Sequence, residues 1–272
     1  MVGNSRSQGF AQASIPEAYE RFMLRQLFEP WARELVGRAH LQPGWSVLDV
    51  ASGLGPVARE AAAAVGPAGR VVATDISEPM LALAAARPAP AGCAPIEFVP
   101  SPASAIAAPD RSFDAVLCQH GLQFFADRAA AIQEMHRVTL PDGVVVLSTW
   151  AAERPLGLFG PMAETLQELG IAEPFPRAFD PDSYRMSSAE LTDLLQDAGF
   201  RGVHVRTAEI DARWDSIETA ASTVLGTPYG PVVAALPGDA QDQVRNRLIT
   251  KLGSSGEHVI VRTASNIARG IN

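Results

Sequence analysis

The chain has 272 residues, of which 47% are hydrophobic, 7% aromatic and 19% charged. This is a globular composition, and it excludes a disordered chain, a coiled coil and a collagen-like repeat. The 22 basic and 30 acidic residues give a net charge of -8, which disfavours nucleic acid as a partner because phosphate groups would be repelled.

Residues 1–14 are small and polar, whereas residues 16–40 carry apolar side chains at roughly helical spacing from Tyr19 to Val36. We predict one or two helices there, broken or restarted near Pro30. They form an N-terminal helical cap over residues 1–40, in which most of the apolar side chains are expected to serve core packing.

Residues 41–150 alternate short apolar strands with alanine-rich helices, and we interpret them as a cofactor-binding core. The predicted strands lie at 46–50, 70–75, 96–100, within 110–119 and at 144–150, and the helices at 57–65, 78–87 and 128–139. Continuous apolar strands that alternate with helices are typical of a parallel sheet covered on both faces. The predicted fold class is therefore α/β.

After Trp150 the pattern changes, because residues 151–190 contain five prolines among many apolar residues. We interpret this stretch as a lid or substrate insertion. Residues 191–272 are predicted to complete the core sheet, with a helix at 189–198, a strand at 202–214, a helical insertion at about 214–254, and a last segment at 257–270 that starts as a strand and ends polar.

Apolar side chains of these two insertions are expected to cover the carboxyl edge of the sheet and exclude water, or else to pack on the core or on a second subunit. They are Leu156, Leu158, Phe159, Met162, Leu166, Phe175, Phe179, Tyr184, Met186, Trp214 and Tyr229. A homodimer through these surfaces is one possible outcome.

The strongest chemical signal is the segment VLDVASGLGPVA, which places Gly53 and Gly55 in the turn after a strand. Glycines allow a tight turn and close approach of a ligand, and the following helix directs its first N–H groups at that ligand. The pattern Gly53-x-Gly55-x-x-Ala58 also satisfies the loose dinucleotide fingerprint, so the glycines alone are weak evidence.

Two acids sharpen the prediction. Asp49 lies four residues before Gly53, where it can accept from a cationic amine or hold amides of the loop, and where it would repel a pyrophosphate. Asp75 ends the next strand, 20 residues after Gly55, and a carboxylate there can accept from both hydroxyls of a ribose.

With these residues in place, the chain resembles class I S-adenosylmethionine-dependent methyltransferases of the bacterial type related to the menaquinone/ubiquinone-biosynthesis enzymes (methyltransferase type 11). Five blocks match in order over roughly residues 16–205: VLDVASGLGP, VVATDISEPML, DRSFDAVLCQHGLQFFAD, EMHRVTLPDGVVVLSTW and LLQDAGF. The resemblance implies a Rossmann-like sheet of seven mostly parallel strands with an antiparallel last strand, helical lid insertions, and S-adenosyl-L-methionine as cofactor, leaving S-adenosyl-L-homocysteine as product.

The resemblance also implies roles for individual residues. The methionyl part of the cofactor would lie against Ala51, Ser52, Gly53 and Gly55, and Asp49 would hold its amino group or the loop. Asp75 would bind the ribose, and Ile76 and Met80 would lie beside the adenine. Gln119 would border the methyl-donor end, and Tyr19 would close over the cofactor. The relatives often carry Asp-Ala beside the adenine, whereas this chain has Pro102-Ala103 at that place, so Ser101, Ser104 or the backbone would have to substitute for the acid.

His120 is the candidate catalytic base, because it follows Gln119 at the end of the fourth strand and its ordinary pKa lies near neutrality. It is alternatively a pocket histidine that only forms hydrogen bonds. No two histidines have the spacing of metal ligands, so no metal is predicted.

The cellular compartment is predicted from the cysteine content and from the distribution of apolar residues. Cys93 and Cys118 are too few for a disulfide framework, which favours a reduced cytoplasm. The N-terminus has no apolar run behind a basic start, and no stretch reaches the ~18 apolar residues that a membrane span needs. We expect a cytoplasmic protein without a membrane span.

The leading hypothesis is a methyltransferase acting on a hydrophobic or aromatic small molecule of the quinone, polyketide or terpenoid type, in natural product biosynthesis. The alternatives are a cyclase or other non-methylating enzyme that binds S-adenosylmethionine, a nicotinamide-dependent dehydrogenase, which Asp49 disfavours, and a non-catalytic binding subunit.

Overall fold

The computed structural model describes residues 19–89, 91–154, 157, 160–171, 185–225, 229–253 and 258–272. The strands in this part of the chain are β1 (Ser46–Val50), β2 (Arg70–Asp75), β3 (Ile96–Pro100), β4 (Phe113–Gln119), β5 (Thr139–Ala151), β6 (Arg185–Met186), β7 (Arg201–Trp214) and β8 (Val259–Ile271). The helices are η2 (Glu20–Phe28), α3 (Glu29–Ala39), α4 (Pro56–Val65), α5 (Glu78–Ala86), η3 (Leu122–Phe124), α6 (Arg128–Val138), α7 (Gly160–Glu168), α8 (Ser188–Asp197), α9 (Ile217–Leu225), α10 (Tyr229–Ala234) and α11 (Gly238–Leu252).

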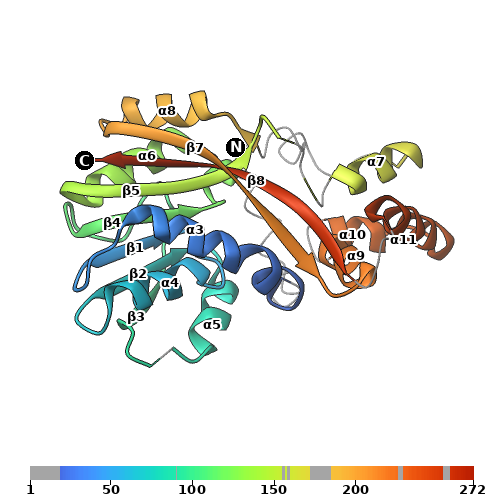
Figure 1. The fold of residues 1–272 in the computed structure, drawn as a ribbon, viewed down its shortest axis with the longest axis horizontal. Helices are drawn as coiled ribbons and strands as arrows, with labels where there is room; N and C mark the ends of the chain where they lie inside the picture. Colours follow the sequence, from blue (N-terminus) through green and yellow to red (C-terminus); the bar gives the residue numbers. More distant parts are fainter. Residues whose placement is uncertain are drawn as a thin grey trace.

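The strands form one sheet in the order β3-β2-β1-β4-β5-β8-β7 (Figure 1). The five strands β3, β2, β1, β4 and β5 run parallel to one another, and β8 is antiparallel to both β5 and β7. This confirms the predicted α/β fold and its antiparallel last strand. The two-residue β6 pairs with the end of β5 and was not predicted. The strand order reverses at β1, and in such sheets ligands bind at the carboxyl ends of the strands at this point.

Both faces of the sheet are covered by helices. Neighbouring residues of a strand point to opposite faces, so Leu117 of β4 packs in the cluster that includes α3 and α4, while Val116 packs in the cluster that includes α6 and α8. The N-terminal helices η2 and α3 follow one another directly, with Pro30 in the first turn of α3, so the predicted restart near Pro30 is confirmed.

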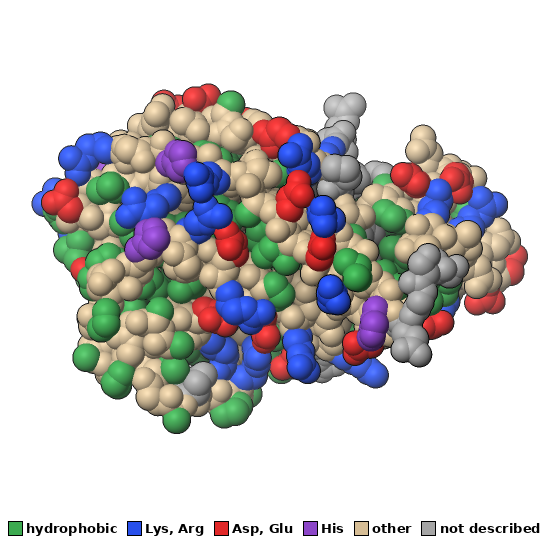
Figure 2. Space-filling model, viewed as in Figure 1, with side chains coloured by type: hydrophobic (Ala, Val, Ile, Leu, Met, Phe, Trp, Pro, Cys, Tyr) green, Lys and Arg blue, Asp and Glu red, His purple; other side chains and the backbone are tan. Residues whose placement is uncertain are grey.

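Strands β7 and β8 extend beyond the end of the neighbouring strand β5. Residues 265–271 of β8 pair with β5, whereas the pairing with β7 continues to Val259. The two strands therefore leave the sheet as a twisted two-stranded ribbon, and helices α7, α9, α10 and α11 gather at its far end (Figure 1). Basic and acidic side chains are interspersed on the face of the molecule drawn in Figure 2. Across the two strands of the ribbon, Arg262 of β8 pairs with Asp211 of β7 at 2.8 Å.

Two hydrogen bonds tie the N-terminal helices to this ribbon. The Trp31 indole N–H donates to Thr263 Oγ1 of β8 at 3.1 Å, and the Trp214 indole N–H donates to the carbonyl of Phe22 at 3.3 Å. Thr223 of α9 donates to the same carbonyl at 2.9 Å. Helix η2 is thereby held between the sheet and the helices at the end of the ribbon.

The last segment differs from the prediction, because the strand continues to Ile271 instead of ending in a polar tail. Its central position between β5 and β7 explains this, since both edges of its backbone find partners there. Strand β5 starts earlier than the predicted strand at 144–150, and residues 141–143 form an irregularity in it, with Asp142 at a φ of 63°.

Of the predicted lid residues, Met162 and Leu166 of α7, Met186 of β6 and Trp214 of β7 are fully buried, and Tyr229 is 6% exposed. The remaining ones, Leu156, Leu158, Phe159, Phe175, Phe179 and Tyr184, lie outside the described residues. Within the described ranges, none of the helices is long and apolar enough to cross a bilayer.

Candidate active site

The loop between β1 and α4 turns by means of left-handed backbone. Ala51, Gly53 and Gly55 have φ values of 56°, 53° and 72°, and Pro56 starts α4. A Cβ added at Gly121, in the loop after β4, would lie 2.7 Å from the Cβ of Ala51. Only glycine allows the two loops to approach so closely, and the ends of β1 and β4 therefore form one continuous rim.

Asp49 lies beneath this loop with 1% of its surface exposed. Its Oδ2 accepts from the backbone N–H of Ala58 at 2.9 Å, whereas Oδ1 is buried without a partner among the described residues. Burial raises the pKa of Asp49 well above its usual range; the Ala58 hydrogen bond opposes this, and the negative charge of Asp75 adds to it. One oxygen thus holds the helix, while the other is left as an open acceptor suited to a cationic donor.

Asp75 fixes the same loop from the next strand. Its Oδ2 accepts from the N–H of Gly53 and its Oδ1 from the N–H of Ser77, both at 2.8 Å. Burial raises the pKa of Asp75, and the backbone N–H groups of Ser77, Gly53 and Ile76 partly offset this. Since a carboxylate offers about four lone-pair sites, Asp75 can still accept from a ligand hydroxyl.

The residues after Asp75 differ in exposure. Ile76 is 53% exposed and is one of two exposed large hydrophobic residues in the part of the chain that the structure describes. Met80 is buried, and its N–H is capped by Ser77 Oγ at 3.4 Å. An isoleucine left in solvent beside the glycine loop offers an apolar surface to a flat ring.

The loop after β3 carries Pro102, Ala103 and Ser104, of which Pro102 and Ser104 are exposed and Ala103 is half-buried. The Ser101 hydroxyl accepts from the N–H of Ala107 at 2.9 Å and donates to the carbonyl of Ala105 at 3.2 Å. Ser101 is therefore engaged inside the loop, and it does not supply the free acceptor that the missing acid would have provided.

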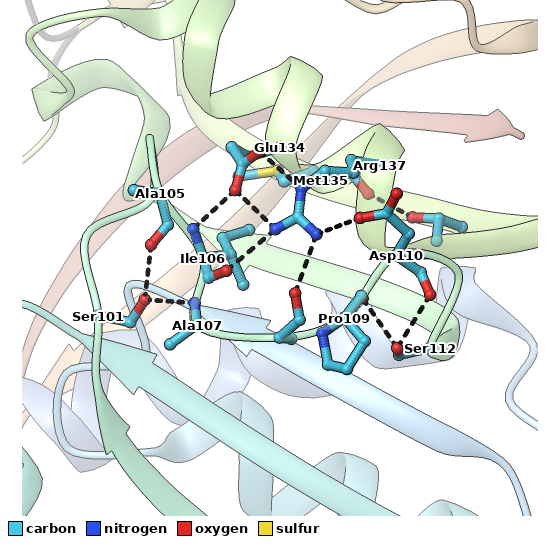
Figure 3. Close-up of polar contacts among 12 residues, drawn as sticks. Ser101, Ala105, Ile106, Ala107, Pro109, Asp110, Ser112, Glu134, Met135 and Arg137 are labelled. Carbon is cyan, nitrogen blue, oxygen red and sulfur yellow. Dashed lines mark hydrogen bonds and ion pairs between the residues drawn. The ribbon is translucent and has the colours of Figure 1, made fainter.

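Arg137 of α6 holds this loop from the side of the sheet away from α3 and α4 (Figure 3). Its guanidinium donates to the carbonyls of Ile106 and Ala108 at 3.0 and 2.9 Å and pairs with Asp110 at 2.7 Å. Glu134, paired with Arg137, accepts from the N–H of Ile106 at 2.8 Å. This cluster determines where the loop beside Pro102 to Ser104 runs.

The end of β4 carries Gln119, whose side-chain N–H donates to the carbonyl of Phe28 at 3.1 Å while its Oε1 is buried without a partner in the described residues. Phe28 also stacks on Tyr19 with ring centroids 4.5 Å apart. Burial and, to a lesser extent, the negative charge of Asp75 raise the pKa of the Tyr19 phenol well above its usual value.

His120 follows Gln119 with a φ of 51°, and its ring is enclosed by aromatic side chains. It stacks on Trp150 with centroids 3.9 Å apart and meets Trp31 and Phe28 edge-on at 5.7 and 6.1 Å. Its Nε2 lies 2.7 Å from Ser265 Oγ of β8. Burial lowers the pKa of His120 to about 3, so the ring is neutral at physiological pH.

Residues 48–147 match the family model described as a methyltransferase domain. The ubiquinone/menaquinone biosynthesis C-methyltransferase UbiE of Escherichia coli is 30% identical over 191 residues, which are 64% of this chain and 73% of that protein. An uncharacterized protein of Mycobacterium tuberculosis is 28% identical over 215 residues, 78% of this chain and 74% of its own length. The solved structure of phosphoethanolamine N-methyltransferase 2 of Haemonchus contortus with S-adenosyl-L-methionine aligns with a TM-score of 0.61 at 16% identity, covering 100% of this chain and 60% of that one.

The chain therefore belongs to the family of S-adenosylmethionine-dependent methyltransferases, and its relatives include the UbiE-type quinone C-methyltransferases. It is an enzyme that uses S-adenosylmethionine as its cofactor. The residues present fit this group: the open oxygen of Asp49 suits an amino group, Asp75 suits a ribose, and Ile76 suits an adenine. Asp49, buried beneath the glycine loop, would repel a pyrophosphate, which disagrees with a dinucleotide.

The structure brings the sequence-predicted residues to one rim, formed by the ends of β1, β2, β3 and β4 with η2 beside them. The surroundings of His120 were not predicted, because Phe28, Trp31, Trp150 and Ser265 are distant from His120 in the sequence. Over the described residues, no group of His, Cys, Asp or Glu side chains could hold a metal ion.

Proposed function

We propose that Asp49, Asp75 and Gln119 hold the amino, ribose and methyl-donor ends of S-adenosylmethionine against the backbone of Ala51, Ser52, Gly53 and Gly55. Ile76, with Met80 buried behind it, and the loop Pro102, Ala103 and Ser104 take the adenine, and Tyr19 closes over the site. When bound, the cofactor supplies an electrophilic methyl group. What the chain then has to do is hold an acceptor atom in line with that methyl group and keep water out.

The proposed acceptor is a hydrophobic or aromatic small molecule of the quinone, polyketide or terpenoid type. The observation that carries this is the aromatic cluster of Phe28, Trp31 and Trp150 around His120, directly after Gln119. Flat apolar molecules gain most from such surroundings. The name of the Escherichia coli relative supports the same class, since it describes a quinone C-methyltransferase. His120 is the proposed catalytic residue, either as a base or as a hydrogen-bond donor.

The test is a substrate panel with the purified protein and S-adenosylmethionine, read by mass spectrometry. The panel contains demethylated quinols, phenolic polyketides and terpenoid alcohols, with short polar metabolites and transfer RNA as comparison compounds. We expect a gain of about one methyl group, roughly 14 Da, in the apolar or aromatic set only. Methylation confined to polar metabolites or RNA would refute the substrate class, and conversion without a mass gain would favour the cyclase alternative.

Further predictions accompany this proposal. We propose that residues 1–40, 151–190 and 214–254 act as cap, lid and insertion around the core, that the protein is cytoplasmic and forms a homodimer, and that nucleic acid is not a partner. Native mass spectrometry of the full chain, with and without S-adenosylhomocysteine, tests the homodimer directly.

A further inference from the structure

We propose that Arg137 and Glu134 of α6 are positioning residues for the adenine side of the cofactor site, because they hold the loop after β3 where its backbone N–H groups meet the base. The inference rests on the proposed function, in which this loop takes the adenine. It goes further by assigning a task in cofactor binding to two residues that act only through the loop.

The first observation is that every N–H group of the Arg137 guanidinium has a partner. Nε and Nη2 donate to the two oxygens of Glu134 at 2.7 and 2.8 Å. The three remaining N–H groups donate to the carbonyls of Ile106 and Ala108 at 3.0 and 2.9 Å and to Asp110 at 2.7 Å (Figure 3). A guanidinium has five N–H donors in a fixed fork, so the whole group is engaged in a geometry that the single ammonium of a lysine does not reproduce.

The loop needs these contacts because it has no regular structure of its own. Crossovers between parallel strands usually contain a helix, whereas residues 101–112 connect β3 to β4 with neither a helix nor a strand. The N–H of Ile106 donates to Glu134 at 2.8 Å, so both backbone polar groups of Ile106 are bound by the α6 pair. Its side chain is only 4% exposed, and backbone groups at such a position are costly to leave unpaired. Arg137 and Glu134 thus supply hydrogen bonds that a helix would otherwise supply.

Ser101 joins the segment held by α6 to the rim of the site. Its hydroxyl accepts from the N–H of Ala107 at 2.9 Å and donates to the carbonyl of Ala105 at 3.2 Å. Its own N–H donates to the carbonyl of Asp75 at 3.0 Å. The turn that follows Ser101 is closed by a bond from the Ala105 N–H to the Pro102 carbonyl at 3.1 Å. This turn is therefore fixed on one side by the end of β2 and on the other by α6.

The turn offers a base mainly backbone groups. Pro102 and Ala103 have no polar side-chain atom, and the Ser101 hydroxyl is engaged. The N–H groups of Ala103 and Ser104 have no hydrogen-bond partner among the described residues, and the ring nitrogens of adenine accept from such groups. A side chain can change its rotamer to meet a ligand, whereas a backbone group lies where its loop lies. Binding of the base through the backbone therefore depends on the residues that fix the loop.

The test is amide hydrogen exchange of the full chain, read by NMR with and without saturating S-adenosylhomocysteine. In the unsubstituted chain, we expect the ligand to protect the amides of Ala103 and Ser104 together with those of the glycine loop, residues 52–55. Arg137→Met should weaken binding by about tenfold, as for one lost hydrogen bond. At saturation it should lose the protection of Ala103 and Ser104 and keep that of the glycine loop. Arg137→Lys, which keeps the positive charge beside Glu134, should behave in the same way.

Arg59→Met is the matched control, because Arg59 also donates to three backbone carbonyls, each at 2.8 Å, but at the end of α5. This variant should keep the protection of both the turn and the glycine loop. Retained protection of the turn in both Arg137 variants, or an equal loss at the two places, would overturn the inference. A ligand that protects only the glycine loop of the unsubstituted chain would also overturn it and leave the proposed function standing, whereas a ligand that protects neither place would overturn both.

Discussion

Replacing Asp49 by asparagine separates the two tasks that the structure gives to this carboxylate. The amide oxygen of asparagine can still accept from the Ala58 N–H, now 2.9 Å from Oδ2, so the start of α4 keeps its bond. The amide N–H₂ takes the place of the open Oδ1 and meets the amino group of the cofactor as a second donor. We therefore expect the fold to persist and the affinity for S-adenosylhomocysteine to fall.

The magnitude follows from the lost interaction. A hydrogen bond that involves a charged group contributes about 1.5–3 kcal/mol, and every 1.4 kcal/mol is about tenfold in affinity. Asp49→Asn should therefore weaken binding by roughly 10- to 150-fold. The unliganded protein should be at least as stable as before, because a buried carboxylate with one unpaired oxygen is replaced by a neutral side chain.

The assay is calorimetric titration with S-adenosylhomocysteine, beside thermal unfolding of the unliganded protein. Asp114→Asn is the matched control, since Asp114 also accepts from a backbone N–H, that of Ser46 at 2.8 Å, but at the opposite end of β1. The affinity of the Asp114→Asn variant for S-adenosylhomocysteine should be unchanged. If Asp49→Asn bound the ligand as tightly as the unsubstituted chain, the open oxygen would not be the site of the amino group.

Four further outcomes are expected. Asp75→Ala should lower cofactor affinity by about 1.5–3 kcal/mol in the same titration; unchanged affinity would contradict the ribose assignment. Gly121→Ala should place a Cβ 2.7 Å from that of Ala51, cost about 1–3 kcal/mol of stability in denaturant unfolding, and weaken binding; a neutral result would mean that the rim can relax. Arg137→Met should free the loop after β3 and raise hydrogen exchange at residues 106–110 before global unfolding, whereas uniform protection would show that Arg137 is dispensable there. Because the pKa of Asp49 is raised in the folded state, its contribution to stability is present below its unfolded pKa of about 3.9 and lost as pH rises through the folded value; Asp49→Asn should flatten that loss in pH-dependent unfolding.

The features that could be predicted are those set by local sequence. Strands β1 and β2, the glycine turn and the acids Asp49 and Asp75 all lie within residues 46–75, so their local pattern predicted this part of the parallel sheet and the meeting of the two acids at one rim. The remaining half depends on contacts between distant segments. His120 meets Ser265 across 145 positions, and that contact exists only because β8 inserts beside β5.

The same reasoning explains the misjudged elements. The last segment looked polar because Thr263, Ser265 and Asn266 interrupt it, yet these side chains are buried and hydrogen-bonded to other parts of the chain. The support of the loop after β3 by Arg137 was equally hidden, since an arginine in a helix ordinarily indicates a solvated face. Arg137, Ser265 and Asn266 thus mark contacts between elements and not exposed surface.

Because β7 and β8 extend beyond the sheet, different parts of the fold support the two sides of the proposed site. Trp31, which lies beside His120, is held to that extension by its hydrogen bond to Thr263. Helix η2, which ends at Phe28, is held there by the hydrogen bonds of Trp214 and of Thr223 in α9 to the carbonyl of Phe22. The glycine bend and its two acids are anchored to the parallel strands instead. In the proposed assignment, substitutions among the distal helices would therefore change the acceptor side of the site and leave the glycine bend with its two acids in place.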